Sequence, residues 1–285
     1  MGGLARRCDT AGDPACLSIG EPIPMSAISL FSSVFVCLVS TVAWAVTLES
    51  SLHHAVRVEG EGARTVIFES GVGDTLEIWK QVQPLVAAGC SRTVAYNRAG
   101  YPGSDAAEQT RDSATVVAEL RAELRRRNIN PPYVLVGHSL GGLYMQYFAR
   151  NFPGEVVGLV LVDSTSWNEG LYIDSAANTP YLGRTAVTLF MPWIMRREIH
   201  DSAAAGEQVR SSPAVSYLPT IVLSATRAPI QQTAAEQGRE ARLQDEIAVD
   251  FPDARHIQVN SGHYIQRDRP EVVVAAAREL AGCRP

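Results

Sequence analysis

A serine between two glycines stands near the middle of the sequence, in the run Gly137-His138-Ser139-Leu140-Gly141. An apolar run typical of a buried strand (133–137) precedes this pentapeptide, and a helical pattern follows it. A serine at a strained strand-to-helix turn exposes its hydroxyl, and small neighbours let the backbone close around it. A glycine-rich turn with an incidental serine would carry no chemistry, but the strand and helix on either side favour Ser139 as a nucleophile.

A serine hydroxyl becomes a strong nucleophile only when a base removes its proton. Three histidines follow the pentapeptide. His200 lies in a charged run and is expected on the surface, and His256 alternates with apolar residues in a strand, where a core or cross-strand role is expected. His263 lies in a loop between that strand and the last helix, so we predict it to be the general base. His138 is predicted to support the site rather than to act as the base.

The acid that would orient this histidine is the least obvious member of the set. Its usual position is the turn after the penultimate strand, here LSATRAP (223–229), which has no carboxylate. Asp163 ends the strand that follows the pentapeptide, so it points to the same sheet edge and can reach the second nitrogen of the histidine. We predict Asp163 to be the acid. In the alternative, Asp163 braces the lid entrance and Asp245 or Asp250 serves instead.

Acyl transfer also requires N–H donors for the developing oxyanion. The backbone N–H of Leu140, directly after the nucleophile, is one candidate. Val72 is the second, because it lies in the loop after strand 64–70 with a glycine on each side, which frees the backbone to turn its N–H inward.

These residues need elements that bring them to one edge of a sheet. Strands are predicted at 64–70, 92–98, 133–137, 156–163, 219–226 and 255–260, and helices at 74–89, 112–128, 140–152, 231–248 and 271–282. Strand–helix–strand alternation of this kind predicts an α/β fold with a mostly parallel sheet. The alternation breaks at about 164–218, which contains a predicted short helix at 184–199. We interpret this segment as a helical lid insertion.

Four blocks of the chain then resemble the α/β-hydrolase superfamily: FESGVGDTLEIW, AYNRAGYPGSD, VLVGHSLGGLYMQYFARNFPGEVVGLVLVDST and NSGHYIQRDRPEVVVAAARELA. The resemblance spans most of residues 60–285. It implies an α/β-hydrolase fold with a mostly parallel eight-stranded sheet flanked by helices, and a hydrolase with no cofactor and no metal. It also supports Val72 and Leu140 as the oxyanion-hole donors. Asn97 stands where relatives usually have aspartate, a departure expected to be structural only.

The expected activity is that of a serine esterase, which cleaves a carboxylic ester or similar acyl bond through a Ser-His-Asp triad and an acyl-enzyme. Dehalogenase and epoxide-hydrolase chemistry is disfavoured, because such relatives carry aspartate in place of the serine. Aromatic and methionine side chains of the lid predict an apolar pocket for a small-molecule ester: Tyr172, Tyr181, Phe190, Met191, Trp193 and Met195. A cofactor-free acyltransferase or perhydrolase, or a non-catalytic ligand-binding protein on the same fold, remains the alternative.

The N-terminus is the compositional anomaly. Residues 26–48 contain no charged side chain, enough to cross a bilayer as a helix, and include Ala43-Trp44-Ala45, a pattern that signal peptidases cut. We predict a leader at 1–48 with a signal peptide or membrane anchor, and a hydrolase domain at 49–285, exported or membrane-anchored. A buried core helix is the alternative, and Met25 is an alternative start to Met1. The net charge of −5 argues against a nucleic-acid partner.

Only two of the five cysteines, Cys90 and Cys283, would remain after removal of the leader. In an oxidising compartment they could form a disulfide. With no geometry to join residues so far apart in sequence, two separate thiols are the favoured expectation. No cysteine or histidine cluster has the spacing of zinc ligands, so no metal site is expected.

Overall fold

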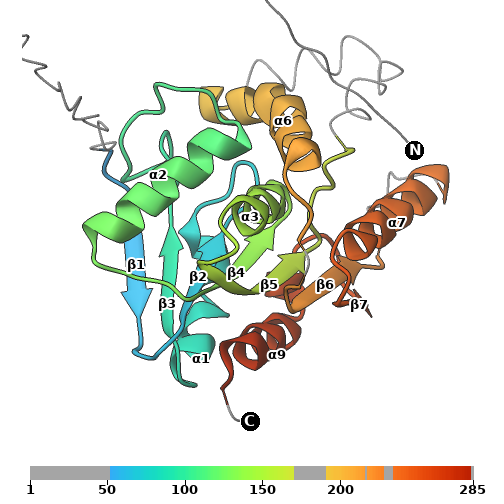
Figure 1. Ribbon diagram of the computed structural model, residues 1–285. Helices are drawn as coiled ribbons and strands as arrows, with labels where there is room; N and C mark the ends of the chain where they lie inside the picture. The colour runs from blue at the N-terminus through green and yellow to red at the C-terminus, as the bar shows by residue number, and fades with distance from the viewer. Residues whose placement is uncertain (1–51, 170–190, 216, 228–233, 284–285) are drawn as a thin grey trace, which may run out of the picture. The chain divides into compact units, whose positions relative to one another are not determined.

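The apolar runs of the sequence form a seven-stranded sheet in the computed structural model, which describes residues 52–169, 191–215, 217–227 and 234–283 (Figure 1). The strand order is β1-β3-β2-β4-β5-β6-β7. The strands are β1 (Val56–Glu59), β2 (Thr65–Glu69), β3 (Arg92–Tyr96), β4 (Tyr133–His138), β5 (Val156–Val162), β6 (Thr220–Ala225) and β7 (Ala254–Val259). Strand β1 pairs antiparallel with β3, and all other neighbours pair parallel. The predicted α/β class and mostly parallel sheet are confirmed, although the described residues contain seven strands rather than eight.

Both faces of the sheet are covered by helices. Successive side chains of a strand point to opposite faces, and in β4 Leu135 and Val136 are each fully buried, in two different apolar clusters. One cluster includes side chains of α2 (Ser113–Arg126), α3 (Leu140–Asn151) and α6 (Trp193–Ser211), and the other includes side chains of α1 (Gln83–Ala87) and α9 (Pro270–Ala281). Helix α7 (Ala234–Val249) packs on β6 and β7, and the short helix α8 (Ile265–Asp268) packs against α9. Burial on both faces explains why the central strands are nearly continuous apolar runs.

The predicted helix at 112–128 is confirmed as α2. The carboxylate of Asp112 accepts the Thr115 N–H at 2.9 Å and caps the first turn. The predicted apolar face of Val116, Val117, Leu120 and Leu124 is buried. This helix therefore forms where the capping residue and the apolar spacing both place it.

The predicted continuous helix over 74–89 is wrong. The segment forms a 3-10 turn, η1 (Leu76–Trp79), and then the short helix α1. Pro84 lies in the first turn of α1, where its missing N–H costs nothing, whereas in a helix interior its ring would clash with the preceding turn. Trp79, Val82 and Val86 are nevertheless buried, as their spacing predicts.

Helix α6 is the helix in the described part of the predicted lid. It starts after Pro192, later than the predicted helix at 184–199, whose residues 184–190 lie outside the described part of the chain. It packs against α2 and α3. In Figure 1 it lies on the side toward which the arrowheads of the parallel strands point. Its role as a lid remains a prediction.

Cys90 and Cys283 form a disulfide, with their Cα atoms 5.5 Å apart, so the expectation of two separate thiols was wrong. Cys90 lies just before β3, and Cys283 follows α9. Packing of α1 against α9 brings these two ends together. A separation of 193 residues conceals this proximity in the sequence.

The described residues all belong to one compact unit, residues 48–285. Within them, no helix has the length and apolar character needed to span a bilayer. The predicted leader, including its apolar segment at 26–48, lies outside the described residues.

Candidate active site

Ser139 occupies a sharp turn between β4 and α3. Its backbone has φ 53° and ψ −126°, a combination that residues with a side chain rarely adopt. Hydrogen bonds hold the turn on both sides: the Ser139 N–H donates to the Val162 carbonyl at 3.2 Å, and the Ser139 carbonyl accepts from Gly142 and Thr165 at 2.9 and 3.0 Å. The strained turn predicted for a nucleophile is therefore present.

Two glycines after Ser139 are required by close approach. A Cβ at Gly142 would lie 2.1 Å from the Ser164 hydroxyl oxygen. A Cβ at Gly141 would lie 2.5 Å from the Ser70 carbonyl oxygen. The absence of side chains at these positions lets α3 start directly against β5 and against the loop that follows β2.

His263 lies beside Asp163 at the carboxyl edge of the sheet. The His263 Nδ1 donates to the Asp163 Oδ2 at 2.6 Å. The second oxygen, Asp163 Oδ1, accepts the backbone N–H of Ala225 at 2.8 Å. The last residue of β6 thus supplies a backbone donor, and Asp163, directly after β5, supplies the carboxylate that the turn after β6 lacks.

The surroundings of His263 raise the affinity of its imidazole for a proton. Burial of the His263 ring acts against its protonated form, but the hydrogen bond and negative charge of Asp163 outweigh it, so the pKa of His263 is raised above its ordinary value of 6.5. An orienting carboxylate of this kind fixes the proton on Nδ1 and leaves Nε2 free to accept a proton.

The alternative acids lie elsewhere. The Asp245 carboxylate pairs with His256 at 3.1 Å. The Asp250 carboxylate accepts hydrogen bonds from Arg150 and from the Trp167 indole, each at 2.9 Å. The structure therefore brings Asp163, and neither alternative, to His263.

The other histidines have the environments that the sequence predicts. His256 makes a cross-strand hydrogen bond to the Ser224 hydroxyl at 2.7 Å, and the side chain of His200 is 83% exposed. His138 is fully buried, and burial lowers its pKa to about 3, so its ring is neutral. Its Nε2 donates to the His263 carbonyl at 3.0 Å, because a carbonyl can only accept. His138 thus supports the backbone that carries His263.

The loop after β2 lies against Ser139. A Cβ at Gly71 would lie 3.2 Å from the Ser139 Cβ. The Gly73 N–H donates to the Tyr101 hydroxyl at 2.7 Å and is therefore not available to an oxyanion. Val72 lies between these glycines, and Leu140 opens α3 on the other side of Ser139. Both predicted donors therefore belong to segments that adjoin Ser139.

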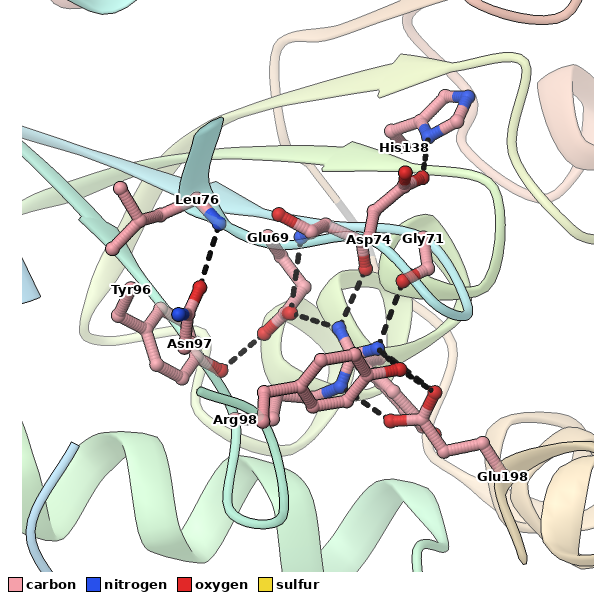
Figure 2. A network of polar contacts seen from close by, with 12 residues as sticks. Glu69, Gly71, Asp74, Leu76, Tyr96, Asn97, Arg98, His138 and Glu198 are labelled. Atoms are coloured by element: carbon pink, nitrogen blue, oxygen red, sulfur yellow. Dashed lines mark hydrogen bonds and ion pairs between the residues drawn. The ribbon is translucent and has the colours of Figure 1, made fainter. Parts of the chain in front are cut away.

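A buried cluster of charges beneath this loop was missed by the sequence analysis (Figure 2). Arg98 pairs with Glu69 at 2.6 Å and with Glu198 at 2.7 Å, and all three side chains are at most 2% exposed. Next to it, Asn97 accepts the Leu76 N–H and donates to the Pro102 carbonyl. An aspartate could not donate the second of these bonds, which gives Asn97 a structural role in the turn.

A cavity of about 610 Å³ opens onto Ser139, Asp163 and His263. Its other described lining residues are mostly polar: Ser164, Thr165, Glu169, Ser224, Ala225, Thr226, Arg227, Gln237, Gly238, Glu240, Ala241, Leu243, Gln244, His256 and Gln258. Many of them come from α7 and from the ends of β6 and β7. Burial raises the pKa of Glu169 to about 7.

The expected apolar wall is not found among these lining residues. Of the lid residues that the structure describes, Met191, Trp193 and Met195 do not line the cavity. The side chain of Met195 lies against Gly73, and Trp193 is 48% exposed. Tyr172, Tyr181 and Phe190 lie outside the described residues. In the described part of the chain, no three histidine, cysteine or acidic side chains are grouped as metal ligands would be.

Comparisons with known proteins agree with this architecture. YqjL of Bacillus subtilis is 26% identical over 254 residues, which cover 84% of this chain and 92% of that protein. An esterase of Thermogutta terrifontis superposes with a TM-score of 0.55 at 17% identity, over 80% of this chain and 92% of that one. The esterase EaEST of Exiguobacterium antarcticum superposes with a TM-score of 0.56 at 14% identity, over 81% and 96%.

The sequence profile of the Alpha/beta hydrolase family matches residues 66–277, well over half of the chain. That match includes the strained serine turn, the loop after β2 and the His263–Asp163 pair. The chain belongs to the alpha/beta hydrolase family.

Proposed function

We propose that this protein is a serine esterase, which hydrolyses a carboxylic ester or a similar acyl bond through Ser139, His263 and Asp163. The observation that carries the proposal is the 2.6 Å bond between His263 and Asp163 at the edge of a cavity that Ser139 also lines. A strained serine, an oriented histidine and a shared cavity are the three parts that acyl transfer to serine requires.

The mechanism has two halves. His263 Nε2 takes the proton of the Ser139 hydroxyl while the oxygen attacks the ester carbonyl, and the N–H groups of Val72 and Leu140 bind the resulting oxyanion. The intermediate collapses to an acyl-enzyme, and the leaving alcohol departs with the proton from His263. Water then attacks the acyl-enzyme with His263 as base again, which releases the acid and restores the Ser139 hydroxyl.

The described lining residues of the cavity offer hydrogen-bonding groups, which supports a substrate that has a polar part. Hydroxyl, amide and charged groups line it, including Glu169 and Arg227. Polar groups of a pocket fix orientation by hydrogen bonding to the ligand, and they bind a hydrocarbon chain poorly because they must lose water without a partner. We therefore propose an ester whose acyl or alcohol part carries hydrogen-bonding groups.

The disulfide supports an extracytoplasmic location, because such bonds persist in oxidising compartments. We propose that the protein is exported or membrane-anchored through its apolar segment at 26–48. Fractionation of the producing cells tests this: recovery of the mature chain in the reducing cytoplasm would contradict it.

The esterase activity is tested with the purified protein and p-nitrophenyl acetate, butyrate and octanoate, with Ser139→Ala as the control. Loss of the nucleophile should lower kcat by several orders of magnitude. Equal background rates from a folded parent and a folded variant would refute the proposal. For the polar substrate, kcat/KM should be higher for a hydroxylated acyl ester than for its hydrocarbon analogue of equal length.

The same assay separates the enzymatic alternatives. A competing alcohol diverts the acyl group to a new ester in an acyltransferase, and hydrogen peroxide diverts it to a peracid in a perhydrolase. Product analysis that finds the free acid as the main product in both mixtures supports the hydrolase.

A further inference from the structure

The guanidinium of Arg98 is enclosed by acceptors. Its Nε and Nη2 donate to the two oxygens of Glu198 at 2.7 and 3.0 Å, and its Nη1 donates to Glu69 at 2.6 Å. The remaining donors reach the backbone carbonyls of Ser70 at 2.6 Å and Gly71 at 2.9 Å. All five N–H groups of the side chain are thereby used, so the guanidinium has one orientation.

This orientation fixes the direction of the Val72 N–H. In a trans peptide the carbonyl of one residue and the N–H of the next point in opposite directions. Arg98 draws the Gly71 carbonyl to its own side of the loop. The Val72 N–H must then point away from Arg98. A Cβ built at Gly71 would lie 3.0 Å from the His138 Nδ1 and 3.2 Å from the Ser139 Cβ, so both residues lie close to this part of the loop. Figure 2 shows Arg98 and His138 on either side of this loop.

Glu198 also acts on the next residue of the loop. The Tyr101 hydroxyl donates to Glu198 at 2.6 Å and accepts the Gly73 N–H at 2.7 Å. The carboxylate of Glu198 thus holds the loop at two points, at Gly71 through Arg98 and at Gly73 through Tyr101.

Glu198 belongs to α6, and the same helix touches the loop directly. A Cβ at Gly73 would lie 2.6 Å from the Met195 side chain. Helix α6, about 100 residues further along the chain, therefore determines where the loop after β2 sits.

We propose that Glu198 is a positioning residue for the oxyanion hole: it orients Arg98 and Tyr101, which hold the loop 70–73 so that the Val72 N–H faces the oxyanion. This inference rests on the proposed esterase function. Glu198 is fully buried and is not among the residues that line the cavity, so we expect it to act on the transition state and not on substrate binding. Loss of a whole oxyanion donor costs about 10²–10³ in kcat.

The test is Glu198→Gln, which keeps the size of the side chain but replaces one acceptor of the Arg98–Tyr101 cluster by a donor. We expect kcat to fall about tenfold or more, with KM nearly unchanged. Affinity for a trifluoromethyl ketone, whose adduct with serine carries an oxyanion, should fall in parallel with kcat. Tyr101→Phe, which removes only one hydroxyl, should shift both quantities in the same direction and serves if Glu198→Gln does not fold.

Glu119→Gln is the matched control. Glu119 forms a buried bidentate pair with Arg111 at 2.9 Å, similar to that of Glu198 with Arg98, but away from the loop. It should lower Tm and leave kcat and inhibitor affinity at parent values. If Glu198→Gln and Tyr101→Phe also leave kcat and inhibitor affinity at parent values, as the Glu119→Gln control should, the positioning role is refuted. Fluorophosphonate labelling of the parent separates the two proposals, because an unreactive Ser139 would overturn the esterase function and this inference with it.

Discussion

Replacement of Asp163 by asparagine changes one atom of the site, and the structure fixes what that atom does. Asp163 accepts two hydrogen bonds, from His263 Nδ1 and from the Ala225 N–H. The Ala225 N–H can only donate, so in Asp163→Asn the amide oxygen must face Ala225. The amide NH₂ then faces His263 and forces Nδ1 to accept.

The histidine proton must consequently move to Nε2, the nitrogen that has to take the proton from Ser139. The backbone of Asp163 has φ 43°, which asparagine tolerates well, so the substitution adds no strain. A tautomer error of this kind lowers kcat by about 10⁴. That factor corresponds to about 5 kcal/mol of lost transition-state stabilisation.

The assay is kcat for p-nitrophenyl butyrate, at a pH above the pKa of His263, with Tm as a check on folding. Asp245→Asn is the control, because Asp245 pairs with His256 and makes no bond to His263. We expect the control to retain the parent rate. A folded Asp163→Asn protein within tenfold of the parent would refute Asp163 as the orienting acid.

Three further predictions concern the pH dependence of the rate, the disulfide and Gly141 of α3. Because the pKa of His263 is raised and only its neutral form accepts a proton, kcat/KM should rise with pH through a midpoint above 6.5; a midpoint below 6.5 in the pH–rate profile would contradict this. Cys283→Ser should lower the free energy of unfolding by about 2–4 kcal/mol, since the reduced chain gains conformational freedom, and unchanged urea midpoints for parent and variant would oppose it. Gly141→Ala should lower both Tm and kcat, because its methyl group would lie 2.5 Å from the Ser70 carbonyl oxygen. Gly154→Ala, with no atom within 4 Å of the new methyl group, should change neither quantity, and equal behaviour of the two variants would contradict the crowding argument.

Much of the fold could be predicted because the strands of a parallel sheet are buried on both faces and read as apolar runs. Strand β4 was predicted at 133–137 and found at Tyr133–His138, and β5 was predicted at 156–163 and found at Val156–Val162. Strand ends then indicate which loops meet at one edge of the sheet. The predicted strand ends are enough to expect Asp163 and His263 on one edge of the sheet.

Contacts between distant segments could not be predicted, because a single sequence holds no sign of them. Arg98 and Glu198 are 100 residues apart, and each looks like an ordinary surface charge in its own stretch of chain. The same holds for the disulfide. The break between η1 and α1 is different, because Pro84 stood in the sequence and its missing N–H already argued against one continuous helix.

The position of Asp163 has a consequence for how such a protein can diversify. Ser139 and Asp163 lie in one continuous β4–α3–β5 unit, and the segment at about 164–218, which joins β5 to β6, follows both of them. With the proposed acid after β6, this segment would separate it in the chain from the proposed nucleophile. Here the packing of the β4–α3–β5 unit alone places Ser139 relative to Asp163. The first part of the segment, before α6, can therefore be exchanged or lengthened without moving either residue. Selection can therefore remodel this part of the segment without changing how Ser139 and Asp163 are placed.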